Sequence, residues 1–310
     1  MSDEANVAAK GGGLHLRLPA TSANLGPGFD TLGLAMSFYL TVDAIASPDG
    51  AFAIEATGRD RELCGSLERN LILDTYRDVV ERAGGVPVAL HLLLHNEIPL
   101  GMGCGSSAAA LLAGVLLANH FGELGWTGFQ AMEEACRREG HPDNVAACWL
   151  GGMTASAMDE DGKAVIAASF GQESKWGLML ALPSIGLATS KARALLPESY
   201  SRRDAVMNVQ HTALLVSAFA LQRGDLLKTA MGDRLHQPYR SEACPLLPLL
   251  IPVVNCPGVM GVALSGAGPS VLVIYNRERV AEVRQAVLER AGEVELIEAD
   301  TSKGTSVMVT

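Results

Sequence analysis

The segment Pro99-Leu-Gly-Met-Gly-Cys-Gly-Ser-Ser107 places three alternate glycines directly before an apolar stretch that predicts a buried helix over residues 106–120. Glycine adopts backbone conformations closed to other residues and lets the chain approach a ligand closely. Ser106 or Ser107 is expected to cap the helix. Because a helix N-terminus presents unpaired N–H groups and a positive dipole end, the segment predicts phosphate binding. A glycine-rich turn that only caps a core helix is the alternative.

Two common phosphate-binding motifs do not fit this segment. It lacks the Gly-Lys-Ser/Thr end of a Walker A loop, and no acidic residue ends a second strand about 20 residues further on, as the dinucleotide fingerprint requires. The whole chain contains only six lysines. Charge neutralisation at a bound phosphate is therefore expected from the helix, from Mg²⁺ and from residues elsewhere in the chain.

Composition narrows the class of partner and compartment. The formal net charge is −10 and no basic run occurs, which argues against a nucleic-acid or anionic-membrane partner. No stretch is long and apolar enough to span a bilayer, and the polar N-terminus does not resemble a signal peptide. The six cysteines form no CxxC pair and show no zinc spacing, so we expect reduced thiols in a cytoplasm.

Strand and helix patterns alternate along both halves of the 310 residues. In the first half, strands are expected at 14–18, 34–47, 51–57 and 88–95, helices at 70–83, 106–120 and 127–138, and a polar loop at 19–30. The second half predicts strands at 177–183, 294–299 and 306–309, two further strands within 262–275, and helices at 203–222, 224–231 and 280–291. This mixture indicates an α+β protein with two domains, 14–155 and 156–310.

Three segments in one order carry a resemblance to a known family. They are Pro19-Ala-Thr-Ser-Ala-Asn-Leu-Gly-Pro-Gly-Phe-Asp30, the glycine segment at 99–107 and Ser265-Gly-Ala-Gly-Pro-Ser270, with His-Pro-Asp-Asn at 141–144 before the last. Together they resemble the GHMP kinases, named for galactokinase, homoserine kinase, mevalonate kinase and phosphomevalonate kinase. The first segment is similar to that of the homoserine kinase branch and lacks the Gly-Glu-His element of mevalonate kinase and galactokinase. Cys104 departs from the family, which usually has an aliphatic residue there.

The resemblance implies a fold and an activity. The fold would be the two-domain GHMP kinase fold, with an N-terminal domain like domain 2 of ribosomal protein S5 and a ferredoxin-like C-terminal domain. The activity would be phosphorylation of the L-homoserine hydroxyl by ATP with Mg²⁺ in a homodimer, as a step toward threonine. A kinase for another small hydroxylated metabolite and a non-catalytic ligand-sensing paralogue are the alternatives.

The resemblance also implies roles for individual residues. Asn24 and Asp30 would hold the ammonium group of the substrate, while Arg193 and Arg240 would clamp its carboxylate, beside Thr189. Arginine suits this role because its planar fork binds two oxygens at once. The implied ATP-binding residues are Asn70, Pro99, Leu100, Gly101, Met102, Gly103, Cys104, Gly105, Ser106 and Ser107.

The resemblance also implies which residues bind Mg²⁺ and whether a residue takes up the proton of the substrate hydroxyl. Glu133 on the 127–138 helix would bind Mg²⁺ together with a serine of the 106–107 pair, Ser107, whereas Glu134 would face about 100° away. Asn144 stands where mevalonate kinase has a catalytic aspartate, and an amide cannot take up a proton at neutral pH. The resemblance therefore implies catalysis by positioning and electrostatics, with Asn144 orienting the hydroxyl, no dedicated base, and His141 structural.

Overall fold

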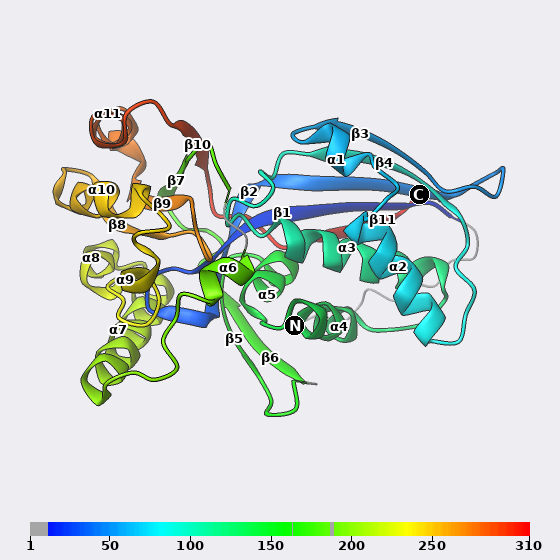
Figure 1. The fold of residues 1–310 in the computed structure, drawn as a ribbon, viewed down its shortest axis with the longest axis horizontal. Coiled ribbons are helices and arrows are strands. Elements are labelled where there is room, and N and C mark those ends of the chain that lie inside the picture. Colours follow the sequence, from blue (N-terminus) through cyan, green and yellow to red (C-terminus); the bar gives the residue numbers. More distant parts are fainter. Residues whose placement is uncertain (1–11, 163, 187–188) are drawn as a thin grey trace.

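The computed structural model describes residues 12–162, 164–186 and 189–310. These residues form two lobes, each built around a β-sheet (Figure 1). The first lobe holds β1 (Leu14–Asn24), β2 (Gly28–Ala46), β3 (Ala53–Gly58), β4 (Leu90–Asn96), β5 (Met153–Met158), β6 (Val165–Phe170) and β11 (Ser306–Val309). The sheet order is β11-β1-β2-β4-β3, and β5 pairs with both β2 and β6.

Four helices pack along one face of this sheet: α2 (Leu71–Arg82), α3 (Ser106–Phe121), α4 (Gly128–Glu139) and α5 (Asp143–Leu150) (Figure 1). The short helix α1 (Arg61–Cys64) follows β3. Helix α3 is apolar on all sides and forms the centre of the core, with ten of its residues buried. The start of α3 is thereby held rigidly against the first strands.

The second lobe confirms the ferredoxin-like expectation. Its strands are β7 (Trp176–Leu182), β8 (Val259–Leu264), β9 (Val271–Asn276) and β10 (Glu295–Ala299), in the order β10-β7-β9-β8 with every neighbouring pair antiparallel. Between β7 and β8 lie α6 (Thr189–Arg193), α7 (Arg202–Ala220), η1 (Gly224–Leu226), α8 (Leu227–Ala230), α9 (Gln237–Arg240), α10 (Leu246–Leu250) and η2 (Ile251–Asn255), and between β9 and β10 lie η3 (Arg277–Arg279) and α11 (Val280–Ala291). This is the β-α-β-β-α-β order of that fold.

Two boundaries differ from the sequence-based expectation. The division at residue 155 falls inside β5, and β6 and β11 also belong to the first sheet, because pairing partners far apart in sequence decide sheet membership. The polar loop expected at 19–30 is largely strand: β1 runs to Asn24, β2 begins at Gly28, and only a short turn separates them. In the part of the chain that the structure describes, no helix is long and apolar enough to cross a membrane.

Candidate active site

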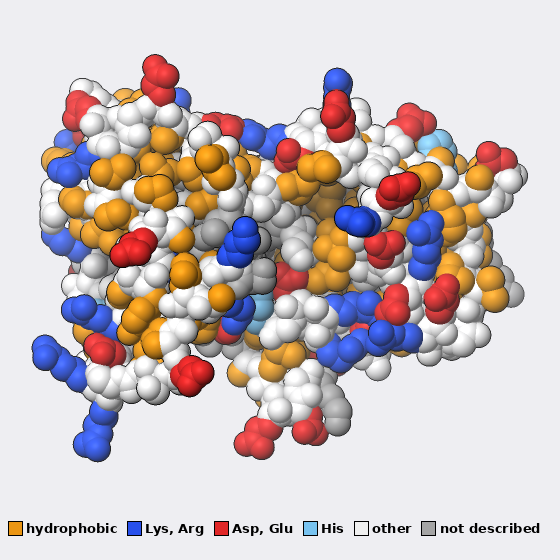
Figure 2. Space-filling view, in the orientation of Figure 1, with side chains coloured by type: hydrophobic (Ala, Val, Ile, Leu, Met, Phe, Trp, Pro, Cys, Tyr) orange, Lys and Arg blue, Asp and Glu red, His pale blue; other side chains and the backbone are white. Residues whose placement is uncertain are grey.

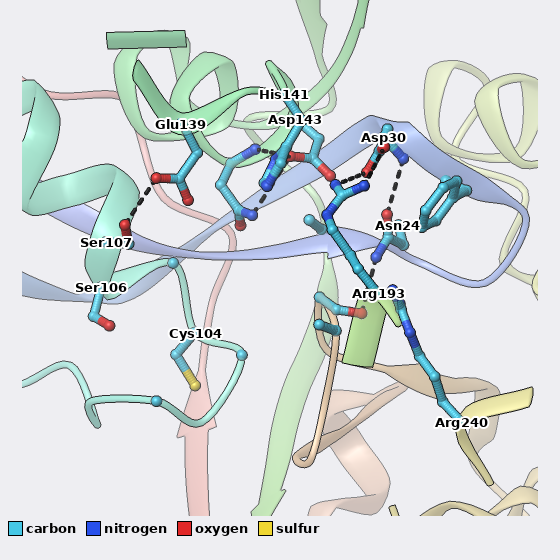
Figure 3. Close-up of a pocket in the computed structure, with 18 residues that line it drawn as sticks. Asn24, Asp30, Cys104, Ser106, Ser107, Glu139, His141, Asp143, Arg193 and Arg240 are labelled. Atoms are coloured by element: carbon cyan, nitrogen blue, oxygen red, sulfur yellow. Dashed lines mark hydrogen bonds and ion pairs between the residues drawn. The ribbon is translucent and has the colours of Figure 1, made fainter. Parts of the chain in front are cut away.

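A pocket lies where the two lobes meet, and all three family segments contribute to its wall (Figure 3). Its cavity volume is about 210 Å³. Its lining residues come from the first segment, the glycine segment, the end of α4, the turn into α5 and its first residues, α6, α9 and the third segment: Ala23, Asn24, Phe29, Asp30, Gly101, Gly103, Cys104, Gly105, Ser106, Ser107, Glu139, His141, Asp143, Asn144, Arg193, Arg240, Gly266 and Ala267.

The glycine segment leads into α3 in conformations that only glycine adopts without strain. Gly103 and Gly105 have φ of 74° and 72°. A Cβ on Gly105 would lie 1.9 Å from Thr21 Oγ1, so a side chain is excluded by space as well. Gly105 itself is the N-cap of α3, and no side chain caps this helix, so the expected cap by Ser106 or Ser107 is wrong. The first N–H groups of α3 therefore keep their capacity to bind an anion.

The third segment ties the first two together. Ser265 Oγ donates to the carbonyl of Gly103 at 2.7 Å, and Asn24 Nδ2 donates to the carbonyl of Gly266 at 2.9 Å. Asn24 Oδ1 also accepts the N–H of Asp30 at 3.0 Å. Asn24 and Asp30 have positive φ, 68° and 54°, which is uncommon for residues with a side chain and concentrates at functional sites.

Asp30 and Arg193 form a bidentate ion pair in the pocket (Figure 3). Arg193 Nη1 and Nη2 donate to the two carboxylate oxygens at 3.0 and 2.6 Å. Burial lowers the pKa of Arg193, but the hydrogen bond to Asp30 together with the negative charges of Asp30, Asp143 and Glu139 outweighs burial, so the pKa is raised. Asp30, expected to bind the substrate's ammonium group, and Arg193, expected to bind its carboxylate, therefore lie together and neutralise each other's charge.

Among the residues that the structure describes, Arg240 is the largest fully buried side chain, at 1% exposure. Its Nε donates to the carbonyl of Ala192 at 3.2 Å, and its Nη1 faces His236 Nδ1 at 3.0 Å. Within residues 12–162, 164–186 and 189–310, no carboxylate forms an ion pair with it. Burial, and next the charge of Arg193, lower the pKa of Arg240. A buried cation without a counter-ion is costly, so Arg240 favours an anionic ligand.

Asn144 is held in one orientation by its neighbours at the start of α5. Its Oδ1 accepts the hydroxyl of Thr21 at 2.8 Å, and its backbone N–H donates to Asp143 Oδ1 at 2.7 Å. Asp143 is buried and also lies 2.6 Å from His141 Nδ1. Because a carboxylate only accepts, His141 Nδ1 carries the proton of this bond. Asn144 Nδ2 also donates to Asp143 Oδ1 at 3.5 Å, which leaves its second amide hydrogen for a ligand in the pocket.

His141 should make stability depend on pH. Burial lowers the pKa of His141, but the bond to Asp143 and the nearby carboxylates outweigh burial and raise it above the ordinary value. For a raised pKa, the stabilisation is complete below the unfolded-state pKa of about 6.5 and is lost as pH rises through the folded-state pKa. The Tm difference between wild type and His141→Asn should therefore be largest near pH 5.5 and shrink toward pH 9. A Tm difference that does not depend on pH would contradict the assignment.

Glu133 does not line the pocket. Its Oε1 accepts the N–H of Val165 on β6 at 3.3 Å, away from the glycine segment. Glu139, six residues further along α4, lines the pocket instead and accepts the hydroxyl of Ser107 at 2.8 Å. Six residues turn a helix by about 600°, so these two glutamates face different sides. The carboxylate that the fold brings to the glycine segment is Glu139, and the expectation for Glu133 is corrected accordingly.

A second, more apolar pocket adjoins the first and shares Ser106 and Ser107 with it. Figure 2 shows hydrophobic side chains around this hollow in the first lobe. Its walls come from β2, α1, the connection to α2 and its start, β4, the segment after β4 and the start of α3: Leu40, Leu63, Cys64, Ser66, Glu68, Arg69, Asn70, Leu71, Ile72, Leu94, Asn96, Ile98, Leu100 and Ala110. Such a wall suits a flat, largely apolar group such as a nucleobase.

The remaining expected site residues lie as follows. Asn70 borders the second pocket, but its side chain caps α2 by accepting from Ile72 and Leu73 and donating to the carbonyls of Cys64 and Ser66. Leu100 lines the same pocket, whereas Pro99 and Met102 line neither. Thr189 is the first residue of α6, and its side chain lies outside the described residues.

Comparison with known proteins decides the family. The profile of the GHMP kinases N terminal domain matches residues 70–152, and that of the GHMP kinases C terminal matches residues 215–293. A homoserine kinase of Solibacter usitatus is 44% identical over 290 residues, which cover 92% of this chain and 93% of the relative. The chain belongs to the homoserine kinase family of GHMP kinases.

Solved structures agree with this family. A Listeria monocytogenes protein assigned as a homoserine kinase is 29% identical, with a TM-score of 0.76 over 95% of this chain and 99% of that one. The homoserine kinase of Cytophaga hutchinsonii shares the fold at 23% identity, with a TM-score of 0.80 over 98% and 100% of the two chains.

The family segments did not point to four of the residues in and beside the pocket. Phe29 lies within the first segment and lines the pocket, and Thr21 in the same segment fixes Asn144. Glu139 directly precedes Gly140, the residue with φ of 85° that ends α4. A glycine that ends a helix can be recognised in the sequence, so the position of Glu139 at the end of α4 could have been predicted. His236 lies beside Arg240, and their spacing of four residues, which places two side chains next to each other on one helical turn, is the sequence signal for that contact.

Proposed function

We propose that this chain phosphorylates the hydroxyl of L-homoserine with MgATP. The observation that carries the proposal is the buried, unpaired Arg240 beside the Asp30–Arg193 pair, at the end of a pocket that begins at the N-terminus of α3. An amino-acid zwitterion supplies a carboxylate for the two arginines and an ammonium group for Asp30. Its side-chain hydroxyl then faces Asn144 and the glycine segment.

ATP fits the two adjoining pockets. The apolar pocket would take the nucleoside, and the N–H groups at the start of α3 would bind the phosphates at the boundary marked by Ser106 and Ser107. Ser107 and Glu139 offer a hydroxyl and a carboxylate side by side, the hard oxygen donors that Mg²⁺ uses together with phosphates and water. A metal bound there would supply positive charge to the phosphates in a chain with few lysines.

The chain's own residues would act by placing the reactants. Asn144, fixed by Thr21 and Asp143, would orient the homoserine hydroxyl toward the γ-phosphorus. The hydroxyl oxygen forms the new P–O bond while the bond to the leaving ADP breaks, and the hydroxyl proton passes to the transferred phosphoryl group. The N–H groups of α3 would stabilise the negative charge of the transferring group throughout. No carboxylate or imidazole is required as a base.

A ligand panel tests the substrate. Thermal shifts would be measured with a non-hydrolysable ATP analogue and homoserine, mevalonate, galactose or threonine, followed by turnover with ATP. Homoserine should give the largest shift and should be phosphorylated. A different preferred hydroxylated ligand would indicate a kinase for another metabolite, and binding without turnover would indicate a non-catalytic sensor.

Arg193→Ala and Arg240→Ala should each raise the homoserine KM about 10- to 100-fold. A charge-assisted bond to a carboxylate contributes about 1.5–3 kcal/mol, and neither arginine reaches the apolar pocket proposed for the nucleoside. The ATP KM should therefore change little. Arg284→Ala removes an exposed arginine that pairs with Glu298 and serves as the control. An unchanged homoserine KM in both site variants would remove the carboxylate clamp from the proposal.

Location and assembly follow as further proposals. All six cysteines are free thiols and four are buried, which supports a reducing cytoplasm. The absence of a basic run supports small-molecule ligands in place of nucleic acid or membrane. The homodimer implied by the family resemblance stays a prediction.

A further inference from the structure

His236 lies between two parts of the active site without reaching the pocket itself. Its side chain is fully buried, at 0% exposure. The ring lies 2.7 Å from the carbonyl of Gly26 through Nε2 and 3.0 Å from Arg240 Nη1 through Nδ1. Gly26 belongs to the turn between Asn24 and Asp30, so one imidazole connects this turn to the buried arginine.

These two contacts fix the tautomer of His236. A guanidinium only donates hydrogen bonds and a carbonyl only accepts them. Nδ1 must therefore carry the lone pair that accepts from Arg240, and Nε2 must carry the hydrogen that is donated to Gly26. The imidazole that satisfies both contacts is neutral.

The surroundings hold the ring in this position. Phe29 stacks on His236 with ring centroids 5.5 Å apart and an interplanar angle of 28°, and the Arg240 guanidinium lies 5.5 Å from the centroid of the same phenyl ring. Asp233 lies 3.5 Å from His236 Nε2, but its carboxylate accepts three backbone N–H groups, from Leu235, His236 and Gln237. Asp233 thus fixes the backbone of His236 at the start of α9.

We propose that neutral His236 is a positioning residue that aims Arg240 into the active-site pocket and ties it to the Asn24–Asp30 turn. This inference rests on the proposed carboxylate role of Arg240. Without an acceptor at Nδ1, the guanidinium keeps only its bond to the carbonyl of Ala192 and can rotate away from the pocket. The Arg240 guanidinium is then no longer held in a fixed position relative to the Asn24–Asp30 turn.

Two amide variants separate the two contacts. His236→Asn puts an oxygen where Nδ1 lies and can still accept from Arg240, but it cannot reach Gly26. His236→Gln can reach Gly26 with its amide N–H but offers no acceptor at the Nδ1 position. We expect the homoserine KM to rise about tenfold or more in His236→Gln and clearly less in His236→Asn, with the ATP KM nearly constant in both.

The pH dependence gives a second readout that a purely structural role would not move. Burial lowers the pKa of His236, the charge of Arg240 lowers it further, and the charges of Asp233 and Asp30 oppose this. Below that pKa an Nδ1–H would point at the guanidinium and displace it. The homoserine KM of wild type should therefore rise as pH falls through this lowered pKa, which lies below the ordinary histidine value of about 6.5. This rise should be absent in His236→Asn, whose amide does not titrate.

The outcomes are distinct. If wild type does not phosphorylate homoserine, the proposed function fails. If wild type is active but both variants change the homoserine KM equally, or His236→Asn is the worse, the positioning role is wrong. A lowered Tm together with a raised ATP KM identifies a variant that is merely misfolded. In that case the homoserine KM of wild type at acid pH still tests the proposal, because the absence of a rise would overturn it.

Discussion

Glu139→Gln is expected to lower kcat by roughly 100-fold and to move the Mg²⁺ dependence to higher concentrations. The amide keeps the shape of the side chain but removes the charge that would hold the metal beside Ser107. Glu139 is also the last residue of α4, where the negative end of the helix dipole disfavours a carboxylate by about 0.3–1 kcal/mol. The variant should therefore be as stable as wild type, or slightly more stable, while it loses activity.

Glu133→Gln is the matched control on the same helix. Glu133 bonds to the backbone of β6, and an amide oxygen can accept that bond equally well. Its kcat and Mg²⁺ dependence should stay within about twofold of wild type, as expected for a substitution that leaves the pocket untouched. A loss of activity in Glu133→Gln together with a silent Glu139→Gln would show that the metal assignment is reversed.

The sequence predicted Glu133 as the metal ligand, whereas the fold brings Glu139 to Ser107. This difference shows what the sequence could not decide. The resemblance predicted that the metal ligand lies on α4, but it did not predict how α4 is rotated about its axis relative to the glycine segment. That rotation is set by packing: Met132, Ala135 and Cys136 are buried, which turns Glu133 toward β6 and leaves the end of the helix over the start of α3. The apolar pattern of α4 could have indicated this, whereas the distance to Ser107 could not be read from it.

The fold and the meeting of the three segments were predictable to a larger degree. Alternating patterns and glycine turns gave the α+β class, and the resemblance gave the ferredoxin-like second sheet, which the strand order confirms. The return of β11 to the first sheet was not predictable, because its partner β1 lies almost 300 residues away and short strands carry no signal of their register. The contact of His236 with Arg240 is different, because these residues are only four positions apart and the i, i+4 spacing on one helical turn could have indicated it.

Asn144→Ala is expected to slow turnover while leaving the shape of the kcat pH profile unchanged. The substitution removes the amide that Thr21 holds in place, so the homoserine hydroxyl loses its orientation. If no residue accepts the hydroxyl proton, this misplacement lowers kcat equally at every pH. A general base would instead give wild type a descending acid limb with its own pKa.

Asn144→Asp is expected to lower kcat by about 100-fold at neutral pH, although a carboxylate is the group that the base-using relatives have here. The introduced charge would lie beside the buried Asp143, in a pocket that also contains Glu139 and Asp30. Like charges at about 4 Å repel by roughly 4 kcal/mol near a protein surface, and the incoming phosphates add to this repulsion. Activity should recover partly as pH falls and the introduced carboxyl takes up a proton, which is opposite to the behaviour of a base. If the kcat of wild type has an acid limb that persists in Asn144→Ala and vanishes on replacing His141 or Asp143, the enzyme uses a base and the positioning mechanism is wrong.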